Sequence, residues 1–210
     1  AKLKRMRNLE VAEIVDQVAL IDKQSKLYFD RPLSNIVFMG MGEPMMNYKN
    51  VVDAIRKITQ EDGLGMSARR ITVSTSGIPK MMKMLADENL KVKLALSLHS
   101  AIEHKRNEIM PFSTKFPLTE IMEAMQYWYD KTGSRITFEY CVWKGINDGD
   151  EDIKALIKYC KQVPCKVNLI QYNPIGEGKF DHRSIEAEEK YVRELEKAGI
   201  TALVRRSRGG

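Results

Sequence analysis

Short apolar runs alternate with stretches of helical periodicity along this chain, and that alternation is the strongest constraint on its fold. Six runs have the length and branched composition of buried strands, namely residues 36–39, 71–73, 92–98, 135–142, 167–170 and 202–204. Apolar residues recur every three or four positions in residues 9–21, 51–58, 81–85, 121–128, 153–160 and 185–195. Strands joined by helices predict an α/β fold with a parallel sheet.

This pattern fits both a Rossmann-type sheet and a (β/α) barrel, and periodicity does not distinguish them. The 210 residues contain no internal repeat or low-complexity linker, which predicts one domain over residues 1–210. The longest apolar runs span only a handful of residues, whereas crossing a bilayer takes roughly 20. The amino end also has no hydrophobic targeting core. We therefore exclude a transmembrane protein and expect a cytoplasmic one.

Charge and cysteine content narrow the class of protein further. The formal net charge is +6, which fits a polyanionic partner without establishing one. Cys141, Cys160 and Cys165 are irregularly spaced, so we expect a reducing compartment and small buried thiols, not a disulfide framework. The three histidines are too scattered for a zinc signature. No metal site is predicted within the chain.

The first polar strand end is Gly40-Met41-Gly42-Glu43-Pro44, directly after the first predicted strand. Ligands of parallel α/β folds bind at the carboxyl ends of the strands. Glycines allow a ligand to approach the backbone, and the Glu43 carboxylate could accept from an ammonium group. The segment lacks the third glycine of a dinucleotide fingerprint and the Gly-Lys-Ser/Thr of a phosphate loop. A simple strand-ending turn is the alternative.

Three later strand ends are polar as well. Ser74-Thr75-Ser76-Gly77 offers hydroxyls and amides suited to a carboxylate or ribose, or serves as a helix cap. Ser97 and His99 flank Leu98 and are expected to face one side, although a single histidine is more often structural. Asn173 precedes a proline and either bonds a ribose or adenine or forms a turn. Together these strand ends predict a polar cofactor at one rim of the sheet.

Further motifs accompany the strand ends, and with them the chain resembles the radical S-adenosylmethionine (SAM) methyltransferases that methylate C2 of adenosine in 23S rRNA, the RlmN/Cfr family. The resemblance covers essentially the whole chain. Its motifs are Arg7-Asn8-Leu9, Gly40-Met41-Gly42-Glu43-Pro44, Arg69-Arg70-Ile71-Thr72-Val73-Ser74-Thr75-Ser76-Gly77, Ser97-Leu98-His99, Arg106-Asn107-Glu108-Ile109-Met110-Pro111, Glu139-Tyr140, Asn147-Asp148-Gly149, Pro164-Cys165-Lys166-Val167-Asn168-Leu169-Ile170, Asn173-Pro174 and Val204-Arg205-Arg206-Ser207-Arg208-Gly209.

The resemblance implies a fold, a cofactor and a set of contacts. The fold would be the partial (β/α) barrel of the radical SAM type, which is TIM-barrel-like, and this decides against the Rossmann sheet. The cofactor would be SAM. The residues that match family positions contacting it are Gly42, Glu43, Ser74, Ser97, Leu98, His99 and Asn173.

The departures from the family concern its cysteines. Family members bind a [4Fe-4S] cluster through Cys-x-x-x-Cys-x-x-Cys, and this chain has no such triplet. The resemblance places that loop just before Ala1 and the methyl-carrying cysteine just after Gly210. We therefore expect no catalytic residue within the chain and no activity from it alone. The alternative is a non-catalytic truncated homologue that binds SAM or RNA.

The resemblance also implies partners. The substrate would be 23S rRNA, with tRNA as a second candidate, and the reductant would be a flavodoxin-like electron donor. Arg205, Arg206 and Arg208 form a basic cluster that we interpret as RNA-binding, because Lys and Arg neutralise phosphates irrespective of sequence. Arg69 and Arg70 fit either an RNA contact or a solvated face.

Overall fold

The computed structural model describes residues 36–38, 47–171 and 182–206, together with Glu13, Val15 and Ala19. Of residues 182–184 and 206 it describes the backbone alone. Glu13, Val15 and Ala19 are helical, as expected for residues 9–21, whose other members lie outside the described residues. The elements are β1 (Ile36–Phe38), α2 (Tyr48–Thr59), η2 (Ala68–Arg70), β2 (Ile71–Thr75), α3 (Pro79–Asp87), β3 (Lys93–Ser97), α4 (Glu103–Ile109), η3 (Pro111–Lys115), α5 (Leu118–Thr132), β4 (Ile136–Tyr140), α6 (Asp150–Cys160), β5 (Cys165–Gln171), α7 (His182–Lys197) and β6 (Thr201–Arg206).

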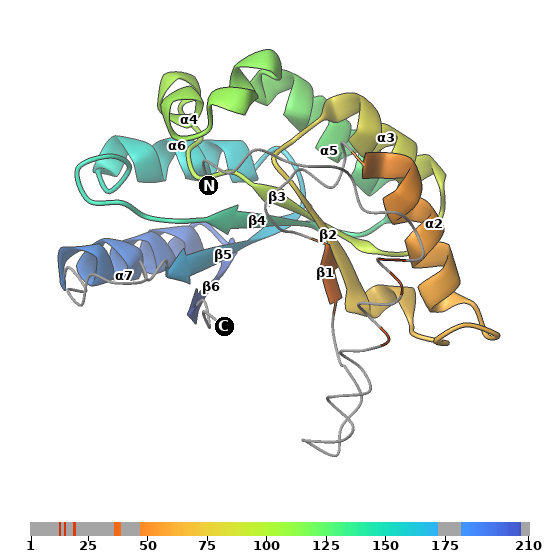
Figure 1. The fold of residues 1–210 in the computed structure, drawn as a ribbon. Coiled ribbons are helices and arrows are strands. Elements are labelled where there is room, and N and C mark those ends of the chain that lie inside the picture. The colour runs from red at the N-terminus through yellow and green to blue at the C-terminus, as the bar shows by residue number, and fades with distance from the viewer. Residues whose placement is uncertain are drawn as a thin grey trace.

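The strands form one sheet in which every neighbouring pair is parallel and the spatial order follows the chain, β1 to β6. A Rossmann sheet instead reverses its strand order near the middle and carries helices on both faces. Here the sheet curves, and the helices lie around its outer side (Figure 1). The fold is therefore the partial (β/α) barrel, as the resemblance implied.

The two faces of the sheet differ in chemistry because side chains alternate along each strand. The outer face packs under the helices through fully buried residues such as Val73, Leu96 and Phe138. The opposite face carries polar residues near the carboxyl ends of the strands, which leaves this end of the inner face equipped for a ligand. They are Ser74, Ser97, Glu139 and Asn168.

One helix was not predicted from the sequence. α4 follows β3, yet its seven residues include a single buried side chain, and that is the guanidinium-bearing Arg106. An amphipathic helix is recognised by an apolar face, and α4 has none, so its pattern resembles that of a polar loop.

The turn from β2 into α3 is tight at Gly77. Its φ of +103° lies in a region that L side chains rarely adopt. A Cβ built there would lie 2.8 Å from Ile121 Cδ1 on α5, and the Gly77 amide donates to Thr75 Oγ1 at 3.0 Å. The loop after β2 is thus held against the helix layer. Among the described residues, no helix is long and apolar enough to cross a membrane.

Candidate ligand site at the carboxyl ends of the strands

The carboxylate of Glu139 joins two of the residues predicted from the strand ends. Ser74 on β2 and Ser97 on β3 both donate to Glu139 Oε2, at 3.1 and 3.3 Å. Ala95 on β3 is in register with Ser74. Its small side chain leaves room for the Ser74 hydroxyl to reach Glu139 across β3. Three strands therefore contribute to one hydrogen-bonded group on the inner face.

Asn168 extends this group to a fourth strand. It is the register partner of Glu139 in the β4–β5 pair. Its Oδ1 atom is buried and has no hydrogen-bond partner among the described residues. A buried acceptor without a partner costs about 1–3 kcal/mol, so a ligand that donates a hydrogen bond here would remove a penalty. Glu139 and Asn168 together suit an ammonium or hydroxyl group.

His99 lies two residues past the end of β3 in a left-handed conformation with φ of 59°. The strand alternation that predicted a shared side for Ser97 and His99 therefore stops at Ser97. The backbone N–H of Cys141 donates to His99 Nδ1 at 3.0 Å, which requires the ring proton to be on Nε2. No described residue accepts from Nε2.

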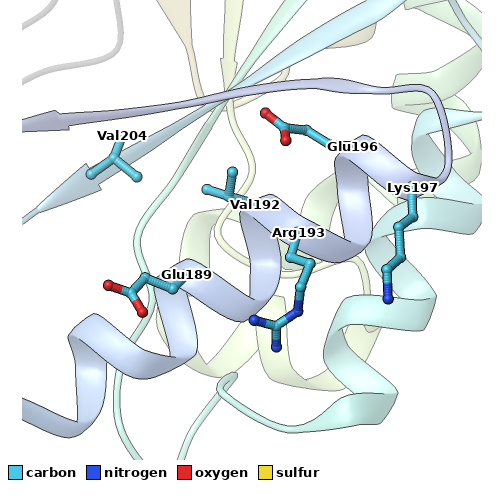
Figure 2. Close-up of a pocket in the computed structure, with 6 residues that line it drawn as sticks. All are labelled: Glu189, Val192, Arg193, Glu196, Lys197 and Val204. Carbon is cyan, nitrogen blue, oxygen red and sulfur yellow. The ribbon is translucent and has the colours of Figure 1, made fainter.

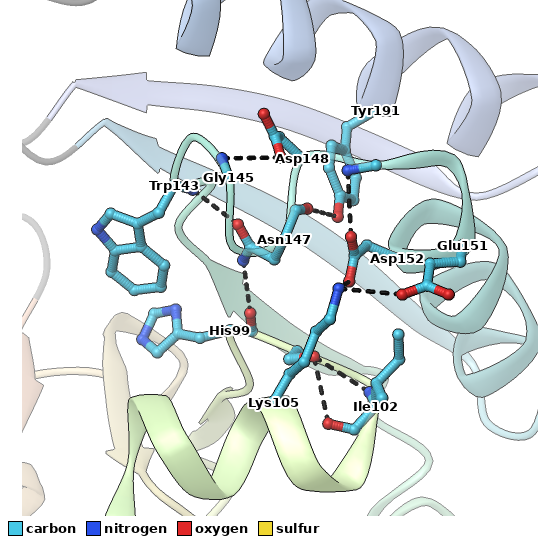
Figure 3. Close-up of polar contacts among 12 residues, drawn as sticks. His99, Ile102, Lys105, Trp143, Gly145, Asn147, Asp148, Glu151, Asp152 and Tyr191 are labelled. Atoms are coloured by element: carbon cyan, nitrogen blue, oxygen red, sulfur yellow. Dashed lines mark hydrogen bonds and ion pairs between the residues drawn. The ribbon is translucent and has the colours of Figure 1, made fainter.

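The surroundings of His99 keep its imidazole neutral. Burial, and then the nearby Arg106 guanidinium, lower the pKa of His99 from 6.5 to about 4. The indole of Trp143 lies edge-on to the ring, with the centroids 5.3 Å apart. At neutral pH, His99 therefore presents a neutral Nε2–H donor beside an aromatic side chain (Figure 3).

Arg106 fixes the backbone of the two strand ends. Its side chain is 1% exposed and donates to the carbonyl oxygens of Ser76 at 2.5 Å, Leu98 at 3.1 Å and Ser97 at 3.2 Å. The Leu98 side chain is fully buried in the core, while its N–H donates to Glu139 O. Leu98 is thus close to the site through its backbone only.

The remaining sequence-predicted residues are placed as follows. Gly42, Glu43, Asn173 and Arg208 lie outside the described residues, as does the side chain of Arg206. Arg205 lies on β6, exposed and in register with Ile170 of β5. Arg69 and Arg70 form η2 at the amino end of β2, opposite the candidate site.

Cys141 and Cys160 are small buried thiols, as expected, whereas Cys165 is half-buried, and its hydrogen bond with Cys160 lowers its pKa. Burial raises the pKa of Cys141 to about 11 and also raises that of Cys160, where a hydrogen bond with Cys165 is the larger cause. None of the three forms a disulfide. In the part of the chain that the structure describes, no three Cys, His, Asp or Glu residues gather to hold a metal. A [4Fe-4S] cluster therefore finds no ligand set among these residues.

A separate hollow of about 600 Å³ lies between α7 and β6 (Figure 2). Glu189, Arg193, Glu196 and Lys197 alternate in charge along its helix wall, and valines form the rest. It contains none of the predicted residues and no converging polar groups, so we assign no ligand to it.

Comparison with known proteins agrees with this architecture. The family model of the radical SAM superfamily matches residues 2–160, most of the chain. The chain belongs to the radical SAM superfamily. Within it, a crystal structure of a radical SAM methyltransferase from Sphaerobacter thermophilus shares 37% identity over 97% of this chain and 60% of that one, with a TM-score of 0.89. SuiB from Streptococcus suis, bound to SAM, shares the fold at 15% identity and a TM-score of 0.67 over 99% of this chain and 45% of that one.

Curated relatives match this radical SAM chain from end to end. Proteins named "probable dual-specificity RNA methyltransferase RlmN" are 65% identical over 100% of the chain in Flavobacterium psychrophilum and 47% identical over 98% in Cytophaga hutchinsonii. The chain spans 60% and 56% of their lengths, respectively.

Four residues of the site had no role predicted from the sequence alone. Glu139 and Asn168 lie inside the predicted strands 135–142 and 167–170 and not at their ends, and Arg106 and Asn147 form hydrogen bonds with backbone atoms of other segments. The alternation of polar residues on the inner face is the signal that could have found Glu139 and Asn168.

Proposed function

We propose that this chain is the SAM-binding barrel of a radical SAM RNA methyltransferase that methylates C2 of adenosine in 23S rRNA, with tRNA as a second substrate. The observation that carries the proposal is the similarity of the whole chain, at up to 65% identity in the comparisons above, to proteins named dual-specificity RNA methyltransferases. Residues 1–210 would form one partial-barrel domain, and with an RNA substrate the protein would act in the cytoplasm.

The polar residues at the carboxyl ends of the strands fit SAM as a ligand. SAM carries an ammonium group, a carboxylate and ribose hydroxyls, and it would supply the methyl group. The Glu139 carboxylate and the unpartnered Asn168 Oδ1 are available as hydrogen-bond acceptors for a ligand, and Ser74 and Ser97 add hydroxyls beside them. His99 contributes a neutral donor. We assign SAM contacts to Ser74, Ser97 and His99, and on the resemblance also to Leu98, Gly42, Glu43 and Asn173.

The RNA and redox parts of the proposal rest on the resemblance. Arg205 is exposed on the edge strand β6, and Arg206 and Arg208 follow it in sequence, so these side chains are the proposed phosphate contacts. The whole enzyme would use a [4Fe-4S] cluster and a flavodoxin-like electron donor. The described residues supply no cluster ligands, so we derive no step through that group.

A chimera tests the proposed activity. The 209 matched residues of the Flavobacterium psychrophilum protein are replaced by this chain, and the purified chimera is incubated anaerobically with labelled SAM, a reductant and unmodified rRNA or tRNA. Because 65% of the replaced residues are identical, we expect 2-methyladenosine to form at a rate within about tenfold of the parental protein. Mass spectrometry of the digested RNA measures it.

The parental protein assayed alongside gives the reference rate. A chimera that folds and binds SAM but transfers no methyl group, while the parent does, would contradict the proposal. That result would favour the non-catalytic binding module.

A further inference from the structure

We propose that Asn147 is a positioning residue of the candidate SAM site, because its side chain sets the orientation of His99 and the path of the loop that carries Trp143. This inference rests on the proposed function. Asn147 lies in the loop between β4 and α6 and is fully buried. It does not itself touch the proposed ligand contacts Ser74 and Ser97.

The Asn147 side chain joins three separate backbone positions. Its Nδ2 donates to His99 O at 2.7 Å and to Cys141 O at 2.8 Å, and its Oδ1 accepts from Trp143 N at 2.7 Å. The segment after β3 and the segment after β4 are thereby tied together (Figure 3).

Every polar group of Asn147 forms a hydrogen bond. Besides the side-chain bonds, its backbone N–H donates to Trp143 O at 3.2 Å, and its carbonyl accepts from the Tyr191 hydroxyl at 2.5 Å. A fully satisfied buried polar network is rigid and specifies one arrangement. Aspartate would keep the acceptor but lose both donors, and alanine would lose all three side-chain bonds.

The two ends of this network meet at the His99 ring. Asn147 holds the His99 carbonyl and the Cys141 carbonyl, while the Cys141 N–H donates to the ring at Nδ1. His99 is held at a φ of 59°, a conformation that is unfavourable for a non-glycine residue and persists only where its surroundings impose it. Asn147 is the side chain that does so, and the result is an Nε2–H donor beside Trp143.

Residues on helices α6 and α7 anchor the loop that carries Asn147. Tyr140 and Tyr191 share a hydrogen bond between their hydroxyls at 2.9 Å, and Tyr191 then reaches the Asn147 carbonyl. On the far side of the loop, Gly149 N donates to Asp152 Oδ2 at 3.1 Å, and Lys105 Nζ donates to Asp152 Oδ1 at 2.9 Å. The loop is therefore anchored on both sides of Asn147.

The experiment compares Asn147→Ala and Asn147→Asp with Asn107→Ala, a control that loses one contact with Ser113. Two-bond ¹H–¹⁵N NMR of the imidazoles reports the tautomer and titration of His99 without any ligand. In wild type we expect a single Nε2–H tautomer that titrates near pH 4. Both Asn147 variants should show mixed tautomers and a titration closer to pH 6.5.

SAM affinity is measured on the same proteins by calorimetry. We expect both Asn147 variants to bind SAM about tenfold more weakly, the equivalent of roughly one lost hydrogen bond. Tyr191→Phe removes the hydroxyl that donates to the Asn147 carbonyl and keeps the packing of α7. This variant tests the proposal if the Asn147 variants fail to fold. Tyr191→Phe should raise the pKa of His99 by less than the Asn147 substitutions do.

The outcomes separate the two proposals. Unchanged His99 tautomer and titration in the folded variants, Tyr191→Phe included, would overturn the positioning role, and so would SAM binding equal to that of Asn107→Ala. If the Asn147 variants show the expected change in His99 tautomer and titration but the wild-type chain does not bind SAM, the result would contradict the SAM site while supporting the role of Asn147 in orienting His99.

Discussion

Replacing Arg106 with methionine should destabilise the chain by about 3–5 kcal/mol, because three carbonyl oxygens lose a buried charged donor at once. Methionine keeps much of the apolar stem, so the loss reports the hydrogen bonds more than the packing. Denaturation by urea, followed by circular dichroism, measures the free energy of unfolding.

Arg70→Met is the matched control, since Arg70 is exposed on η2 at the other end of β2. We expect it to change the free energy of unfolding by about 0.5 kcal/mol or less. Equal effects of the two substitutions would show that the three carbonyl contacts of Arg106 do not support the strand ends.

Acid should destabilise the folded chain through His99. The unfolded side chain binds its proton near pH 6.5, but the folded one binds it only near pH 4. Between these values the unfolded state holds more protons, so stability falls as the pH drops through this window. The full shift corresponds to about 3 kcal/mol, present above pH 6.5 and lost toward pH 4.

The difference between wild type and His99→Gln isolates this contribution. We expect the variant to lose less free energy of unfolding than wild type between pH 6.5 and pH 4, in urea titrations repeated at each pH. His104→Gln, at an exposed position on α4, is the control for the replacement of a histidine by glutamine. An acid dependence in His99→Gln equal to that of wild type would mean that His99 is not held neutral.

The fold was largely predictable from hydrophobic pattern. Each of the six strands appeared as a short apolar run, and their bounds differ from those observed by a few residues at most. Periodicity left open the choice between barrel and Rossmann sheet, because that choice depends on strand order in space. The resemblance predicted the barrel, and the sequential strand order confirms it.

The site was predictable only in part. The polar residues at the strand ends predicted Ser74 and Ser97, and both donate a hydrogen bond to Glu139. Glu139 itself, the acceptor that they share, was not predicted. Arg106 and Asn147 act on carbonyls up to 48 positions away in sequence. No local pattern encodes such contacts, because they form only when separate segments are brought together by the fold.

The most direct test of the proposed site is calorimetric titration of the chain with SAM. We predict saturable binding that Glu139→Gln weakens about tenfold, since the substitution removes the charge between Ser74 and Ser97. Ser134→Ala, at the amino end of β4, should bind as wild type does. A folded chain with no saturable binding, or with binding that Glu139→Gln leaves unchanged, would contradict the assignment of this rim as the SAM site.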